Sequence, residues 1–159
     1  MNAGELDILL VEDNQDDRDL ALHALQRAKV ANRIFVVRDG EEALDFLFCS
    51  GPYTDRNPAH MPKLVLLDLK LPKVDGMEVL RQLRADPRTT SLPVVIMTSS
   101  KEEKDVANGY HLRVNSFIQK PVDFDQFRQT VKAIGLYWLL INQRPQNHLA
   151  KKLAEPVKP

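Results

Sequence analysis

The sequence LVLLDLKLPKVDG occupies residues 64–76. Its first four residues are apolar without interruption, and Asp68 follows them at once. A run of this length fits a strand, and the lack of polar alternation is typical of a strand that is buried on both faces. Such strands belong to parallel sheets that helices cover on each side. The stretch therefore predicts a central strand with an acidic side chain at its carboxyl end.

Four further apolar runs of strand length occur along the chain. They lie at residues 8–11, 34–37, 94–97 and 117–118. Between the runs, apolar residues recur with helical spacing; after the first run these are Leu20, Ala21, Ala24, Leu25 and Ala28. This alternation predicts a doubly wound α/β domain. Five strands suit the flavodoxin-like (βα)5 arrangement with strand order 2-1-3-4-5.

The sequence also indicates where the first and last helices begin. Asn14 is the expected N-cap of the first helix. The acids that follow it, Asp16, Asp17 and Asp19, are interpreted as complements of the helix dipole rather than as metal ligands. An extended last helix is expected over residues 123–142.

One domain is expected over residues 5–143. The connection at residues 49–63 is longer than the roughly two to six residues usual in such folds, so it is interpreted as an inserted surface loop. Residues 144–159 contain too few apolar side chains to fold alone, and a flexible tail is expected there.

Composition and charge exclude several classes of partner. Lysine and arginine total 22, as do aspartate and glutamate, so no net field draws the chain to nucleic acid or to an anionic membrane. Cys49 is the single cysteine, which excludes an internal disulfide framework. No apolar run approaches the roughly 20 residues needed to span a bilayer. A cytoplasmic location is expected.

Polar side chains follow the predicted strands at their carboxyl ends. These are Glu12 and Asp13 after the first, Asp68 after the third, Thr98 after the fourth and Lys120 after the fifth. Ligands of open parallel sheets bind at this edge, so the five side chains are expected to meet in one pocket. Crowded carboxylates repel one another unless a cation neutralises them, and all-oxygen ligation suits Mg²⁺.

This set of groups predicts phosphoryl transfer to a carboxylate. Asp68 is the expected nucleophile, attacking phosphorus in line to give an acyl phosphate. Lys120 is expected to hold one phosphoryl oxygen, and the Thr98 hydroxyl to bond the new group. The fourth-strand loop would then move inward, and that movement is the predicted signal.

Four motifs surround these positions: VEDN at residues 11–14, LLDLKLPKVDG at 66–76, VVIMTSS at 94–100 and SFIQKP at 116–121. In this order and at these spacings they resemble the receiver domains of two-component response regulators. The resemblance implies that a histidine kinase phosphorylates Asp68. It also implies that Asp13, Asp68 and the main-chain carbonyl of Lys70 bind Mg²⁺, with Glu12 acting through water.

By the same resemblance, Thr98 and Lys120 contact the phosphoryl group, and the Lys120–Pro121 bond is cis. Phe117 occupies the position of the aromatic switch residue. It lacks the hydroxyl of the commoner tyrosine, so readout through a hydrogen bond there is not implied. Lys70 departs from the asparagine or small residue often found two places after the acceptor, so no lifetime of the phosphate is implied.

Two rival functions are weighed against this interpretation. A phosphatase of the haloacid-dehalogenase type needs a second acid two residues after the nucleophile, and Lys70 stands there instead. The alternative is a receiver-like binding module that is never phosphorylated, although all five pocket residues are present. The chain is therefore not expected to be an enzyme beyond Mg²⁺-dependent self-phosphorylation and slow autodephosphorylation.

The expected partners are other proteins. The loop at residues 49–63 and the stretch GLYWLLIN at residues 135–142 are similar to stand-alone regulators paired with bacterial and cyanobacterial phytochromes. A phytochrome is therefore the candidate kinase, and a histidine phosphotransfer protein is a further candidate partner.

A homodimer is predicted through the fourth helix, the fifth strand and the last helix. With about 3.6 residues per turn, one stripe of the last helix docks on the sheet. Its residues are Phe124, Phe127, Val131, Ile134, Trp138 and Ile141. Leu136 and Leu140 then lie on the opposite side with Tyr137 and Leu139 on the flanks, and such exposed apolar clusters are typical of interfaces.

Overall fold

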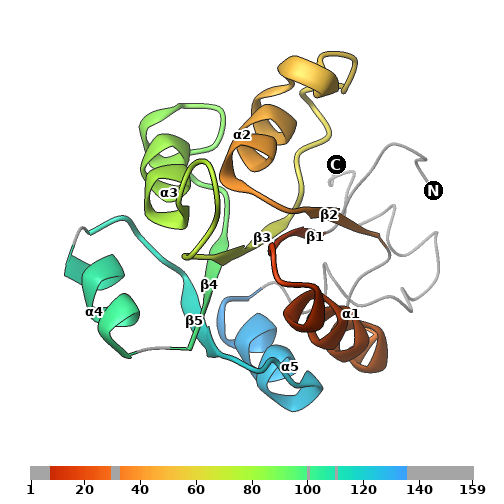
Figure 1. Cartoon of the computed structure of the whole chain (residues 1–159), viewed down its shortest axis with the longest axis vertical. Helices are drawn as coiled ribbons and strands as arrows, with labels where there is room; N and C mark the ends of the chain where they lie inside the picture. The colour runs from red at the N-terminus through yellow and green to blue at the C-terminus, as the bar shows by residue number, and fades with distance from the viewer. Residues whose placement is uncertain (1–7, 30–32, 100, 110, 136–159) are drawn as a thin grey trace, which may run out of the picture.

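The computed structural model of the chain describes residues 8–29, 33–99, 101–109 and 111–135. Parallel strands form one sheet with the order β2-β1-β3-β4-β5 (Figure 1), which confirms the predicted flavodoxin-like arrangement. The strands are β1 (Ile8–Val11), β2 (Ile34–Val37), β3 (Leu64–Asp68), β4 (Val94–Thr98) and β5 (Ser116–Gln119). The helices are α1 (Gln15–Ala28), α2 (Gly40–Phe48), the 3-10 helix η1 (Gly51–Tyr53), α3 (Gly76–Ala85), α4 (Lys101–Gly109) and α5 (Phe124–Ala133).

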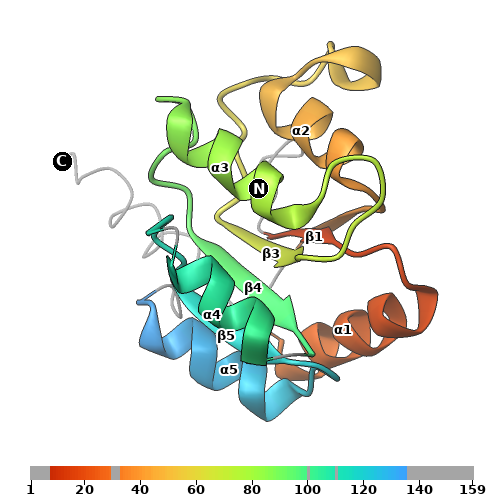
Figure 2. The ribbon, with the colours of Figure 1, turned by 60° about the vertical axis from the view of Figure 1, so that its left-hand side comes forward.

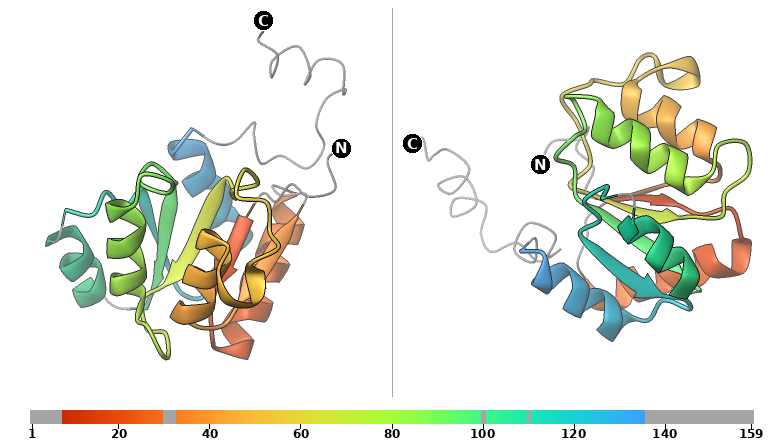
Figure 3. Two further views of the ribbon diagram at one scale, coloured as in Figure 1. Left: turned by 90° about the horizontal axis from the view of Figure 1, so that it is seen from above. Right: turned by 90° about the vertical axis from the view of Figure 1, so that its left-hand side faces the viewer.

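Helices cover both faces of the sheet. Helices α1 and α5 lie on one face, and α2, α3 and α4 lie on the other (Figure 3). Successive strand residues point to opposite faces, so Leu9 and Val65 join the core beneath α2 and α3, whereas Leu10 and Leu66 join the core beneath α1 and α5. The central strands are therefore buried on both faces, as their uninterrupted apolar sequences predicted.

The ends of α1 and α5 test two of the predictions. The side chain of Asn14 accepts a hydrogen bond from the backbone N–H of Asp17, which confirms it as the N-cap of α1. Helix α5 ends at Ala133, and Gly135 takes a φ of 80°. The prediction of one continuous helix over residues 123–142 is therefore wrong, because a left-handed residue ends the helical hydrogen bonding. Residues 136–159 lie outside the described part of the chain.

The loop at residues 49–63 is anchored rather than loosely attached. The Tyr53 hydroxyl donates a 2.6 Å hydrogen bond to Glu42 on α2, and the ring packs edge-on against Phe46. The Arg56 guanidinium lies 3.8 Å over the Phe46 ring and donates to the carbonyl oxygen of His60 at 2.6 Å. These contacts attach the loop to α2, at one end of the molecule (Figure 1).

None of the helices described here combines the length and the apolar character that crossing a membrane would need.

Candidate functional site

The carboxyl ends of four strands meet at one edge of the sheet. Glu12 and Asp13 follow β1, Asp68 ends β3, Thr98 ends β4 and Lys120 follows β5. The register of the parallel strands brings their ends level with one another. Asp68 at the end of β3 pairs with Met97, and Thr98 is the next residue of β4. The edge lies where the strand arrows point in Figure 2. The structure therefore brings all five predicted pocket residues to the same edge.

Three carboxylates cluster at this edge. One oxygen each from Glu12, Asp13 and Asp68 lies within 4.8 Å of the others. Glu12 is 1% exposed and Asp68 is 5% exposed, whereas Asp13 is open to solvent. Several carboxylate oxygens with one open side fit a divalent cation that keeps part of its water shell. The donor set is therefore suited to a divalent metal.

Burial and the neighbouring Asp68 carboxylate together raise the pKa of Glu12 to about 7, against the opposing effect of Lys120. Crowding two acids in a buried pocket disfavours the charged form of one of them. A bound cation would reverse this effect, because it stabilises both negative charges.

Lys120 neutralises part of this charge. Its Nζ atom lies 3.0 Å from Glu12 Oε1, 3.0 Å from Asp17 Oδ2 and 3.0 Å from Asp68 Oδ2. Burial by itself disfavours the ammonium form, but the hydrogen bonds to the three acids outweigh it and raise the pKa of Lys120 above its usual range. Lys120 is therefore a permanent cation held directly beside Asp68. The Lys120–Pro121 peptide bond is cis, as the resemblance implied.

Asp17 has a contact that was not predicted. It lies in the first turn of α1, where it was expected to complement the helix dipole. Its carboxylate also reaches Lys120, which is 103 residues away in the sequence. The local sequence pattern gave no signal for this contact, because Lys120 comes from a distant strand end.

The two predicted switch residues lie beside α4. Thr98 is buried, and its hydroxyl donates a hydrogen bond to the Glu103 carboxylate. Phe117 is half-buried and packs against the core beneath α2 and α3. The Nζ atom of Lys104 lies 5.3 Å from the centre of the Phe117 ring. Sequence reasoning gave no role to either α4 residue.

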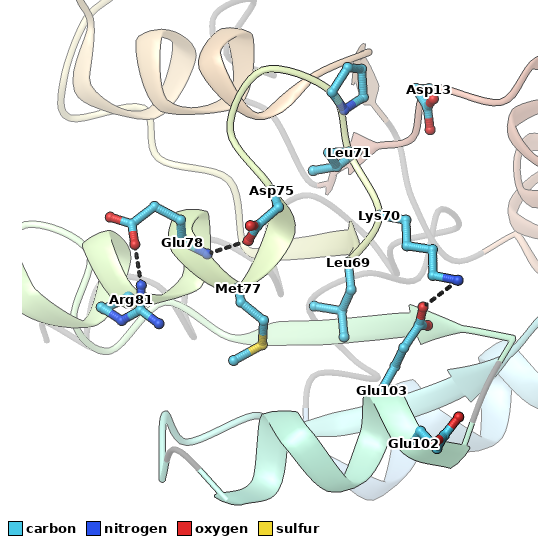
Figure 4. Close-up of a pocket in the computed structure, with 11 residues that line it drawn as sticks. Asp13, Leu69, Lys70, Leu71, Asp75, Met77, Glu78, Arg81, Glu102 and Glu103 are labelled. Atoms are coloured by element: carbon cyan, nitrogen blue, oxygen red, sulfur yellow. Dashed lines mark hydrogen bonds and ion pairs between the residues drawn. The ribbon is translucent and has the colours of Figure 1, made fainter.

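The loop after Asp68 is fixed at both ends. The backbone N–H of Lys70 donates to Asp68 Oδ1 at 3.2 Å, and that of Gly76 donates to the Leu69 carbonyl oxygen at 2.8 Å. Asp75 caps α3 by accepting a 3.0 Å hydrogen bond from the backbone of Glu78. A hollow of ≈ 880 Å³ lies between this loop, α3 and α4, with Asp13 at its rim (Figure 4). The hollow therefore borders Asp13 and the residues that follow Asp68.

Comparison with known proteins agrees with this geometry. The family model for the response regulator receiver domain matches residues 8–132. The chain belongs to the response regulator receiver family. Among curated relatives, it is 41% identical over 138 residues to the probable methanogenesis regulatory protein FilR2 of Methanothrix harundinacea. The aligned region covers 87% of this chain and 86% of FilR2. It is 38% identical over 132 residues to response regulator Rcp1 of Synechocystis, and that alignment covers 83% of this chain and 88% of Rcp1.

Solved structures of this response regulator family are similar over most of their length. The bacteriophytochrome response regulator RtBRR is 44% identical with a TM-score of 0.81, over 97% of this chain and 92% of that one. The Mn²⁺-bound form of Rcp1 is 35% identical with a TM-score of 0.68, over 89% and 99%. Stand-alone response regulators associated with phytochromes are thus among its relatives, as the resemblance predicted.

Proposed function

We propose that this response regulator accepts a phosphoryl group from a histidine kinase on Asp68 and signals by the resulting conformational change. The observation that carries the proposal is the 3.0 Å contact between Asp68 Oδ2 and Lys120 Nζ beside two further carboxylates. A buried carboxylate at the open edge of a sheet, held by a permanent cation, can act as a nucleophile toward phosphorus.

The transfer would proceed by in-line displacement. An oxygen of Asp68 forms a bond to phosphorus while the bond from phosphorus to the donor's imidazole nitrogen breaks, and the imidazole leaves with the bonding electron pair. Lys120 is positioned to hold one phosphoryl oxygen, because it already contacts the attacking carboxylate. The Thr98 hydroxyl is expected to turn to the new phosphoryl group, which would draw the β4–α4 loop inward.

The divalent cation at the acidic cluster would be Mg²⁺. Asp13, Asp68 and the main-chain carbonyl of Lys70 would hold it, with Glu12 acting through water. The existence of a Mn²⁺-bound form of the relative Rcp1 supports a divalent metal. When bound, the cation supplies positive charge that screens the nucleophile from the incoming phosphoryl oxygens.

Phosphoryl acceptance is expected to require the metal. Incubation with acetyl phosphate or a phosphorylated kinase in Mg²⁺ should add the mass of one phosphoryl group, measured by intact-protein mass spectrometry. Excess EDTA should reduce the modified fraction at least about tenfold, because the screening charge is lost. Equal modification with and without EDTA would remove the metal from the proposal.

The kinase we propose is a phytochrome. The similarity to RtBRR and Rcp1 supports this choice, since the structure of RtBRR is described as a bacteriophytochrome response regulator. A histidine phosphotransfer protein would be a second partner, and the cytoplasm the site of action. Phosphotransfer profiling against candidate kinases tests the assignment, and preference for a kinase without a phytochrome sensor would refute it.

A homodimer through α4, β5 and α5 also stays a prediction, because Leu136, Tyr137 and Leu140 lie outside the described residues. In α5 itself, Phe127 and Val131 are fully buried, as the predicted stripe requires. Light scattering at tens of micromolar should give a dimeric mass for the wild type. Leu140→Glu should give a monomer, since a two-fold contact would bring two new charges together. A monomeric wild type, phosphorylated or not, would contradict this interface.

A further inference from the structure

The first turn of α4 contacts both switch residues at once. Glu103 accepts the hydrogen bond of the Thr98 hydroxyl, and the next residue, Lys104, lies over the Phe117 ring. We propose that Glu103 and Lys104 form a latch that holds Thr98 and Phe117 in the unphosphorylated arrangement and releases them when Asp68 is modified. The inference rests on the proposed function, because phosphorylation is the event that opens the latch.

The Thr98 hydroxyl carries the first half of the latch. A hydroxyl has a single hydrogen to donate. While Glu103 accepts that hydrogen, Thr98 cannot donate it to a phosphoryl oxygen on Asp68. Glu103 therefore competes directly with the phosphoryl group for the same donor. A bond to a carboxylate is stronger than one between neutral groups, so the competition raises the cost of switching.

Lys70 sets the position of Glu103. Its Nζ atom lies 3.2 Å from Glu103 Oε2, and Figure 4 shows Glu103 rising from α4 toward Lys70. The backbone N–H of the same lysine donates to Asp68 Oδ1 at 3.2 Å, so the latch joins the acceptor loop directly. The Lys70 side chain is 76% exposed, and an exposed ion pair adds little stability. Such a pair can orient Glu103 and still separate easily.

Lys104 forms the second half of the latch, through its contact with Phe117. A cation over an aromatic face is attracted by the electrons of the ring. The Phe117 ring has no hydroxyl, so its face is the part of the side chain that can make a polar contact. Since Glu103 and Lys104 are consecutive on α4, movement of that turn toward or away from the sheet changes both contacts together. The latch thus couples Thr98 to Phe117.

A simpler interpretation exists for the acids of α4. Glu102 and Glu103 both lie in its first turn, where negative charge complements the helix dipole. Glu102 is exposed and fits that interpretation. Glu103 is 15% exposed and contacts both Thr98 and Lys70, which the dipole does not require. Glu102 is therefore the matched control, with the same charge on the same turn.

The test compares Glu103→Ala with Glu102→Ala by NMR of the Thr98 backbone and the Phe117 ring, before and after acetyl phosphate and Mg²⁺. In unphosphorylated Glu103→Ala, both signals should move toward their positions in the phosphorylated wild type. Loss of one charge-assisted hydrogen bond should raise the ratio of switched to unswitched protein about tenfold. Glu103→Gln should give a smaller change, because its amide oxygen still accepts from Thr98. Glu102→Ala should leave both signals in place.

Two results would overturn the latch: Thr98 and Phe117 signals in Glu103→Ala that match the wild type, or an equal shift in Glu102→Ala. Lys104→Gln tests the coupling, and a change at Phe117 with none at Thr98 would refute it. Mass spectrometry of the same samples reports modification of Asp68. A wild type that is never modified refutes the proposed function, whereas a modified wild type with unshifted Glu103→Ala refutes the latch alone.

Discussion

Asp68→Asn is expected to lose phosphoryl acceptance from both acetyl phosphate and a kinase. The amide nitrogen and oxygen cannot replace the carboxylate as a nucleophile, so modification should fall by at least about a thousandfold. The loss should be chemical rather than structural, because asparagine has nearly the same volume and removes one negative charge from a crowded pocket. Intact-protein mass spectrometry measures the modification, and thermal unfolding measures the fold.

Asp75→Asn is the matched control for this variant. Asp75 lies on the same loop and caps α3. Asparagine caps helices about as well as aspartate, so this variant should be modified like the wild type. Full modification of Asp68→Asn would place the acceptor elsewhere. Loss of modification in both variants would show that the loop, not the Asp68 carboxylate, was responsible.

Gly40→Ala is expected to give the largest loss of stability among single substitutions of the described glycines. Gly40 begins α2 with a φ that any residue can adopt, and alanine favours helices over glycine by about 0.5–1 kcal/mol. A Cβ atom at this position, however, would lie 1.7 Å from the carbonyl oxygen of Val74. Backbone must move to relieve that overlap, so the free energy of unfolding should fall by about 3 kcal/mol or more, measured by urea titration.

Gly135→Ala provides the comparison. Gly135 has a φ of 80° and no heavy atom within 4 Å of an added Cβ. Its substitution should cost only about 1–2 kcal/mol, from the left-handed conformation alone. A Gly40→Ala variant as stable as the wild type would contradict the close packing of α2 on the loop after β3. That loop carries Lys70 and Asp75, so Gly40→Ala should also slow phosphoryl acceptance.

The sequence by itself determined the sheet and the identity of the acidic site. In an uninterrupted apolar run such as residues 64–67, side chains on both faces of the strand need to be buried. Strands of this kind are typical of a parallel sheet that helices cover on each side. In such a sheet the strand ends share one edge, so Asp68, Thr98 and Lys120 had to come together. These inferences need only local periodicity and topology.

The tertiary structure alone decided which side chains contact one another around that site. Asp17 reaches Lys120, Glu103 takes the hydrogen bond of Thr98, and Gly40 packs beneath the loop after β3. None of these pairs follows from periodicity, because a contact between side chains depends on how far each helix is shifted and rotated over the sheet. A shift of α1 or α4 along its own axis would break the contacts of Asp17 and Glu103, yet it would still keep the apolar stripe of each helix against the sheet. The packing of the whole core sets how the helices dock on the sheet. This docking therefore decides which helix side chains contact the residues at the strand ends.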